Sequence, residues 1–215
     1  MRALLRTAGD GPDRVVHRGR DAVYVEIAGR CVGVVSGRAI AVPCALRATV
    51  DALPEVSRAR LDTGVLHLDD EALPIGRVVD VRVPAVRTRA TAPAPEPGDV
   101  TAMVGRGDGL TPYDDDVLCG WLAVHRAAGT ATDEVDAAVR ACLDRTTLLS
   151  ATLLDCAMHG EAIPQFARWL AALDTPAEAE LAYALAAVGH TSGRGLLQGA
   201  RTALTHLRPL EGAAA

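Results

Sequence analysis

The chain has 215 residues, of which 49% are hydrophobic and 3% aromatic, and its formal net charge is −5. This balance argues against a nucleic-acid partner, which needs basic surfaces and aromatic side chains for base stacking. No apolar stretch reaches the ~20 residues of a membrane span, and the first residues do not resemble a signal peptide, so we expect a cytoplasmic protein with no membrane partner. All basic residues are arginine, which excludes chemistry that needs a lysine, such as a Walker-A loop or a Schiff base.

Residues 1–88 are rich in short β-branched segments. They lie at 23–27, 31–35, 39–42, 65–68 and 78–83, and turn residues separate them. Several short strands at close spacing predict a small β-barrel or sandwich, with one helical turn at 46–53. The Pro/Ala-rich residues 89–99 favour an extended connection, so we place the domain boundary there.

Residues 100–208 predict an all-helical domain, followed by a tail at 209–215. Apolar stripes and start signals indicate helices that begin near Asp114, Asp133, Arg145 and Pro164. A capping box at 175–178 starts another helix, and the last helix starts at Thr191 or Ser192. The expected fold class is therefore α+β, with Gly-rich loops at helix N-termini of the helical domain.

The central feature is the segment 104–121, in which Gly105, Gly107 and Gly109 alternate before Thr111-Pro112 and three consecutive acids. A Gly-rich loop before a helix N-terminus favours a bound anion. The alternative is that Asp114 caps the helix and the next two acids complement its dipole. Adjacent carboxylates repel, however, so the cluster also suggests a shared cation or proton.

Two further segments carry a surplus of small and hydroxyl residues. In the first, Thr146, Thr147, Ser150 and Thr152 form a polar strip that either bonds back to its own helix or lines a site. The second segment, 189–194, contains glycines, hydroxyls, a histidine and an arginine. This is more than a helix cap requires, because a cap needs only one hydroxyl. We predict that these segments converge with the Gly-rich loop on one site for a small anionic substrate.

Three motifs together carry a resemblance to a known family. Gly105-x-Gly107-x-Gly109-Leu110-Thr111-Pro112-x-x-Asp115-Asp116, Thr146-Thr147-Leu148-Leu149-Ser150 and Gly189-His190-Thr191-Ser192-Gly193 occur in the order and spacing of the bacterial family that includes the AllH-type subunit of oxamate carbamoyltransferase. The family usually has a glycine where this chain has Asp114. The resemblance implies carbamoyl transfer between phosphate and a small acid amide (oxalurate and oxamate, in purine-nitrogen catabolism), with further subunits as partners.

The candidate site residues follow from the three motifs. We expect catalytic roles for Asp115, Asp116 and His190, and Mg²⁺ is the candidate metal for Asp115 and Asp116, with Asp108 as a third ligand. The expected substrate-binding residues are Gly107, Gly109, Thr111, Thr146, Thr147, Ser150, Thr191, Ser192, Gly193 and Arg194. The alternative to an enzyme subunit is a non-catalytic subunit that docks on a partner, or a metabolite-binding protein. Cys119 leaves a catalytic thiolate open.

Overall fold

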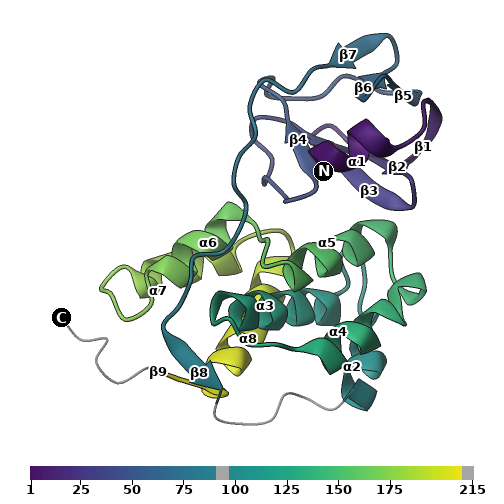
Figure 1. Cartoon of the computed structure of the whole chain (residues 1–215). Helices are drawn as coiled ribbons and strands as arrows, with labels where there is room; N and C mark the ends of the chain where they lie inside the picture. Colours follow the sequence, from purple (N-terminus) through teal and green to yellow (C-terminus); the bar gives the residue numbers. More distant parts are fainter. Residues whose placement is uncertain (91–96, 210–215) are drawn as a thin grey trace. The chain divides into compact units, whose positions relative to one another are not determined.

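The structure is a computed structural model that describes residues 1–90 and 97–209 (Figure 1). Its contacts divide the chain into two units, Met1–Asp80 and Val81–Ala215, which are described separately here. The first unit is built mainly of strands and the second mainly of helices, so the α+β fold class is confirmed. Residues 91–96 of the expected connection and 210–215 of the expected tail lie outside the described residues. The predicted domain bounds stay a prediction.

The N-terminal unit is a curled sheet of seven strands with one short helix (Figure 1). The strand order is β4-β3-β2-β1-β5-β6-β7, and every neighbouring pair is antiparallel except β3 and β4. The elements are α1 (Arg2–Thr7), β1 (Gly11–Arg18), β2 (Ala22–Ile27), β3 (Arg30–Val35), β4 (Ala45–Arg47), β5 (Ala59–Asp62), β6 (Val65–Leu68) and β7 (Glu71–Leu73). Their core buries apolar side chains from β2, β3, β5 and β6, together with Leu5 of α1.

Three local expectations for this unit are wrong. Residues 39–42, which the structure describes, are not a strand; they lead into Pro43, which has no N–H to donate to a ladder. The chain pairs only afterwards, as β4, where we expected a helical turn. In 78–83 only Arg82 forms an isolated bridge, to Glu161. Val78 and Val79 are exposed, whereas Val81 and Val83 are half-buried.

The second unit consists of helices around a buried central helix, α3 (Figure 1). The helices are α2 (Pro97–Met103), α3 (Tyr113–Ala127), α4 (Asp133–Arg140), the 3₁₀ turn η1 (Leu143–Arg145), α5 (Leu148–Met158), α6 (Pro164–Ala171), α7 (Glu178–Ala186) and α8 (Ser192–Thr205). The strands β8 (Thr88–Ala90) and β9 (Leu207–Pro209) pair to form a two-stranded antiparallel ribbon. The capping box expected at 175–178 does not form, because the Thr175 hydroxyl donates to the Ala172 carbonyl instead.

Glycines bring the backbones of α3 and α8 into direct contact. A Cβ atom at Gly199 would lie 1.8 Å from the Val117 carbonyl oxygen, and one at Gly195 would lie 3.0 Å from that of Tyr113. Only glycine fits at this separation. The contacts advance along both helices in the same direction, so α3 and α8 run parallel and their N-termini share one end. This arrangement places the first and third sequence motifs side by side.

Candidate functional site

The Gly-rich loop is folded tightly against the helices around it. Gly105, Gly107 and Gly109 have φ angles of +81°, +122° and +91°, in the region that side chains disfavour. A Cβ at Gly105 would lie 2.3 Å from the Arg145 carbonyl oxygen, and one at Gly107 would lie 2.6 Å from the Tyr113 nitrogen. Two of the three glycines are therefore required by close backbone contacts as well as by their φ angles.

Asp114 holds the two ends of this loop together. Its carboxylate lies 3.0 Å from Arg106 Nε, and its N–H donates to the Arg106 carbonyl over 3.1 Å. The capping position of α3 is occupied by Pro112, so Asp114 is not the cap. The Arg106 side chain is largely exposed, and such surface pairs contribute about 1 kcal/mol or less. Asp114 thus stabilises the shape of the loop.

Asp115 accepts three hydrogen bonds, one from within the first motif and two from the second motif. Its Oδ1 accepts the Gly105 N–H at 2.8 Å, and its Oδ2 accepts the hydroxyls of Thr146 at 2.5 Å and Ser150 at 2.6 Å. The side chain is fully buried, where a polar group needs hydrogen-bond partners within the protein. Both oxygens of Asp115 are therefore engaged by the protein itself.

The hydroxyl residues of the second motif form the entry to α5 and not a strip along it. Thr147 is the N-cap: its Oγ1 accepts the Ser150 N–H at 3.0 Å and donates to the Leu110 carbonyl at 2.5 Å. Thr152 donates back to the Leu148 carbonyl, as one of our two alternatives proposed. Thr146, Thr147 and Ser150 each donate their single hydroxyl hydrogen to a protein group. Toward a ligand, these hydroxyls can therefore act only as acceptors.

The third motif meets the first through a pair of hydroxyls. The oxygens of Thr111 and Ser192 lie 2.9 Å apart. Ser192 begins α8, and Thr191, at the cap position, makes no capping side-chain hydrogen bond. His190 and Arg194 are exposed, and Arg194 donates to the His190 carbonyl. The structure therefore brings Ser192 to the junction and leaves the side chains of His190 and Arg194 at the surface.

Asp116 lies between the first and third motifs. Its side chain is buried against α8, where a Cβ at Gly195 would come within 2.8 Å of Asp116 Cβ. Within the described residues, its Oδ2 is buried without a hydrogen-bond partner. Burial raises the pKa of Asp116 to about 7; the hydroxyls of Ser192 and Thr111 lower it, and the charge of Asp115 raises it. Those hydroxyls are thus close to the carboxyl without bonding to Oδ2.

The described side chains do not fit the Mg²⁺ site that the acids suggested. Among them, no group of three or more His, Cys, Asp or Glu residues is arranged to hold a metal. Asp115 already accepts three hydrogen bonds, burial favours the neutral form of Asp116, and Asp108 is exposed. A divalent cation needs several free oxygen ligands, and this set does not supply them.

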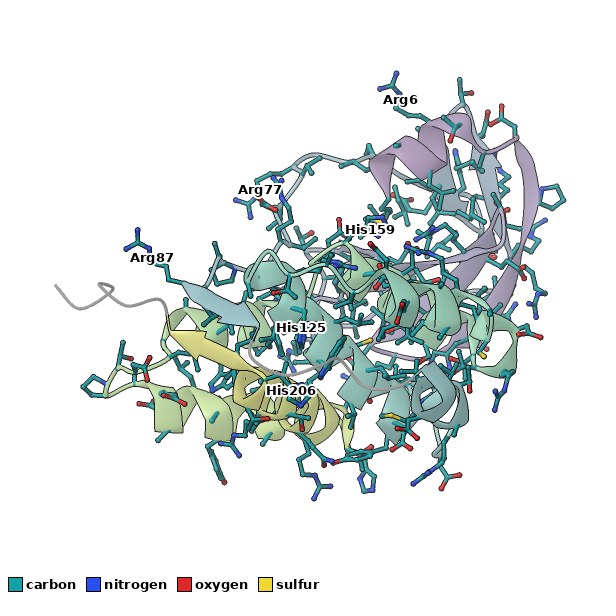
Figure 2. The ribbon with its side chains drawn as sticks, turned by 60° about the horizontal axis from the view of Figure 1, so that its bottom comes forward. Arg6, Arg77, Arg87, His125, His159 and His206 are labelled. Atoms are coloured by element: carbon teal, nitrogen blue, oxygen red, sulfur yellow. The ribbon has the colours of Figure 1, made fainter. Side chains whose placement is uncertain are left out.

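Two other buried groups on α3 have environments unlike those of catalytic residues. Burial raises the pKa of Cys119 well above its ordinary value, which disfavours a nucleophilic thiolate. Burial also lowers the pKa of His125, whose ring stacks on Trp121 with centroids 3.7 Å apart. His206 lies 6.4 Å from the His125 ring inside the helical unit (Figure 2). These residues fill the core of the helical unit.

The sequence analysis missed the glycines at which α3 and α8 meet. Gly195 and Gly199 are four residues apart, so they lie on one face of a helix. Gly120 faces them from α3, where a Cβ would lie 2.0 Å from the Leu196 carbonyl oxygen. The Gly-x-x-x-Gly spacing was the signal that could have predicted this close helix contact.

The fold and the junction define an α+β protein in which a glycine-rich loop connects the starts of three helices. Residues 103–204 match the family model described as oxamate carbamoyltransferase subunit AllH. The match contains all three motifs and confirms the resemblance. No curated protein and no solved structure matches the chain. The family description suggests a subunit of oxamate carbamoyltransferase, and hence partner subunits. None of the described helices is long and apolar enough to span a membrane.

Proposed function

We propose that this chain is a subunit of oxamate carbamoyltransferase that binds a small substrate bearing an oxyanion and an amide at the junction of the three motifs. The observation that carries the proposal is the Asp115 network, which fixes the loop and the start of α5 against each other. The reaction would transfer a carbamoyl group from oxalurate to phosphate, giving oxamate and carbamoyl phosphate, in purine-nitrogen catabolism.

The hydroxyls of the second motif favour an amide. Thr146 and Thr147 are partly exposed, and their hydrogens are directed to Asp115 and the Leu110 carbonyl. An oxygen that donates inward presents lone pairs to a ligand, and a carbamoyl NH₂ group supplies two N–H donors for them. Asp115 acts here as a positioning residue, because it orients the hydroxyls without contacting the ligand.

The loop and the helix starts favour an oxyanion. Gly107 and Gly109 are exposed and have no side chain to keep a ligand from the backbone. The N-termini of α3 and α8 lie at one end, where partial positive charge favours a phosphate or carboxylate. Thr191, Arg194 and His190, around the start of α8, would complete this side of the site, with His190 as a proton donor. Gly193 is buried and its N–H donates to the Val188 carbonyl, so it supports the turn and does not bind the ligand.

Binding measurements test this proposal directly. Isothermal titration of the purified chain, alone and with its partner subunits, would use phosphate, carbamoyl phosphate and oxamate, each with and without Mg²⁺. We expect oxamate and carbamoyl phosphate to bind without Mg²⁺ and Thr146→Val to weaken both at least tenfold, since a lost buried hydrogen bond costs about 1–3 kcal/mol. Thr202→Val is the matched control, because that hydroxyl is exposed and bonds to its own helix.

Several outcomes would contradict the proposal. Absence of binding by all three compounds, even with partner subunits present, would favour a docking subunit without a ligand site. Equal binding by Thr146→Val and wild type would place the ligand elsewhere. Binding without turnover by the assembled subunits would favour a metabolite-binding protein.

A further inference from the structure

The helix α7 is apolar on every side, although one of its sides is exposed. Seven of its nine residues are hydrophobic, and the other two are Glu178 and Glu180 in the first turn. The helix packs on α6 and α8 and buries Ala182 and Leu185, and Figure 1 shows it at the outside of the helical unit. A helix that is hydrophobic all round is normally buried, so this sequence fits a helix that is covered on both sides.

The exposed side of α7, called the α7 face below, consists of Ala179, Glu180, Tyr183, Ala184 and Ala187. Tyr183 is 80% exposed, more than any other large hydrophobic side chain that the structure describes. Ala179 and Ala187 flank it at i−4 and i+4, so one bulky side chain stands between two small ones on the same face of the helix. Exposed tyrosines of this kind are enriched as anchors at protein interfaces, whereas a solvated helix face is mainly charged or polar.

The α7 face is complementary in shape to a second copy of itself in an antiparallel pairing. When Tyr183 of one copy packs on Ala187 of the other, two-fold symmetry places Tyr183 of the other copy on Ala187 of the first. Each bulky ring then lies on a small residue, and each small residue receives a ring. Because both residues are already exposed, the pairing needs no rearrangement of the helical unit.

Charge selects this register over its alternative. Arg194 donates to the His190 carbonyl at 2.9 Å, so its guanidinium lies at the C-terminal end of α7. In this register Glu180 of each copy lies opposite His190 of the other copy and faces that guanidinium, which is the attractive arrangement of charges. In the alternative register, with Tyr183 opposite Ala179, the first-turn glutamates of both copies would gather near the two-fold axis, where like charges repel.

We propose that the α7 face binds the α7 face of a second copy of this chain, antiparallel about a two-fold axis, with Tyr183 of each copy on Ala187 of the other. The dimer goes beyond the proposed function and needs no substrate. A single helix face is smaller than a standard interface of about 1,200–2,000 Å², so the dimer forms at high protein concentration and dissociates at low concentration. In the dimer the third motif of each copy lies beside the first turn of α7 of the other.

Sedimentation velocity of the full chain over a range of concentrations tests the association. We expect a monomer–dimer equilibrium without any ligand, and Tyr183→Ala should raise the dimer dissociation constant at least about tenfold, as for the loss of an interface anchor. Ala187→Arg should have the same effect. Both side chains are exposed in the monomer, so the variants should keep the fold, which circular dichroism checks. Val79→Ala is the matched control, because it truncates an exposed apolar side chain outside α7 and should leave the dissociation constant unchanged.

Cross-linking with a short bismaleimide tests the register. In the proposed pairing Ala184 lies opposite residue 186 of the other copy, so two Ala184→Cys side chains are about 3 Å apart along the helix axes, whereas two Ala179→Cys side chains are about 18 Å apart. Ala184→Cys should therefore cross-link and Ala179→Cys should not. The five native cysteines are buried, so the wild-type chain should not cross-link either.

Three outcomes would overturn the inference. The first is a chain that stays monomeric at every concentration. The second is efficient cross-linking of Ala179→Cys, which would mean another register or a parallel pairing. The third is a chain that stays monomeric alone but binds a different subunit through Tyr183, because the α7 face would then belong to that subunit and not to a second copy.

Discussion

The hydroxyl oxygens of Thr111 and Ser192 lie 2.9 Å apart, although 81 positions separate the two residues in the chain. Each stands at a helix start where a hydroxyl would ordinarily cap the helix, yet Ser192 is already the first residue of α8. The pair joins the Gly-rich loop to α8. Because neither hydroxyl caps a helix, both remain available to a ligand.

Removing one member of this pair should separate binding from stability. We expect Ser192→Ala to change the free energy of unfolding by about 1 kcal/mol or less, as for a partly exposed hydrogen bond. Oxamate affinity should fall at least tenfold. Urea denaturation and calorimetric titration measure the two quantities. Thr205→Ala, which removes a hydroxyl bonded within α8, is the control and should affect neither. A stability loss as large as the loss in binding free energy would contradict this separation.

Asp115 should matter far more to stability than its neighbour Asp114. Asp115→Ala leaves the buried Ser150 hydroxyl and the Gly105 N–H without their acceptor, at about 1–3 kcal/mol each. Asp114→Ala removes only a pair with the exposed Arg106, worth about 1 kcal/mol or less. Denaturant unfolding of both variants gives the comparison. Equal losses would mean that the buried network does not hold the loop.

The contact between α3 and α8 should be too close to accommodate even one added methyl group. Gly199→Ala places a Cβ against the Val117 carbonyl, which forces the helices apart. Overpacking of this kind costs about 1–3 kcal/mol, occasionally more, although alanine is the better helix former by about 1 kcal/mol. Thr202→Ala, on the exposed face of α8, should be near neutral. A thermal scan that finds Gly199→Ala more stable than wild type would refute the close contact.

Asp136 has two arginine partners that differ in burial. Arg126 donates to Asp136 and also to the Met158 and Thr130 carbonyls, whereas Arg140 is exposed and lies 3.8 Å from the acid. Breaking a buried pair by removing one partner costs about 3–5 kcal/mol, so Asp136→Ala should be strongly destabilising. Arg140→Ala should cost about 1 kcal/mol or less. Urea midpoints of the two variants would test this contrast.

Stability should also respond to pH through Asp116. Since folding raises the pKa of this acid from 3.8 to about 7, the folded state binds the proton more tightly than the unfolded state. Its contribution is full below about pH 4 and is lost as pH rises through about 7. Buried His125, with a lowered pKa, gives the opposite slope, so the comparison must be between wild type and Asp116→Asn. The variant should gain relative stability as pH rises, and a constant difference in unfolding free energy would contradict the shift.

Local patterns predicted much of the fold. The strands β2, β3 and β6 and most helix starts follow from short-range apolar spacing, which depends little on the rest of the chain. The strand β1, Gly11–Arg18, lacks a clear alternation and was missed; its pairing with β2 and β5 decides its conformation. The segment 39–42 has strand-like residues but is followed by proline.

The candidate site, like the fold, could be predicted only in part from the sequence. That three motifs carry a surplus of polar and small residues was visible in the sequence. That Asp115 accepts from Ser150, 35 positions away, depends on how α3 packs on α5, and no local pattern contains this information. The unequal environments of Asp115 and Asp116 follow from the same packing. Neighbouring acids of identical chemistry are therefore assigned different roles by tertiary contacts alone.

The glycine contact between α3 and α8 limits how the junction could be engineered. Because the two backbones touch at Gly195 and Gly199, the loop and Ser192 keep their spacing only when both helices are present in this pairing. A transplant of the Gly-rich loop into another scaffold would lose half of the hydroxyl pair. The smallest unit that could be transferred to another scaffold is thus a pair of parallel helices that are distant in the chain. One short segment of the sequence would not be a functional fragment.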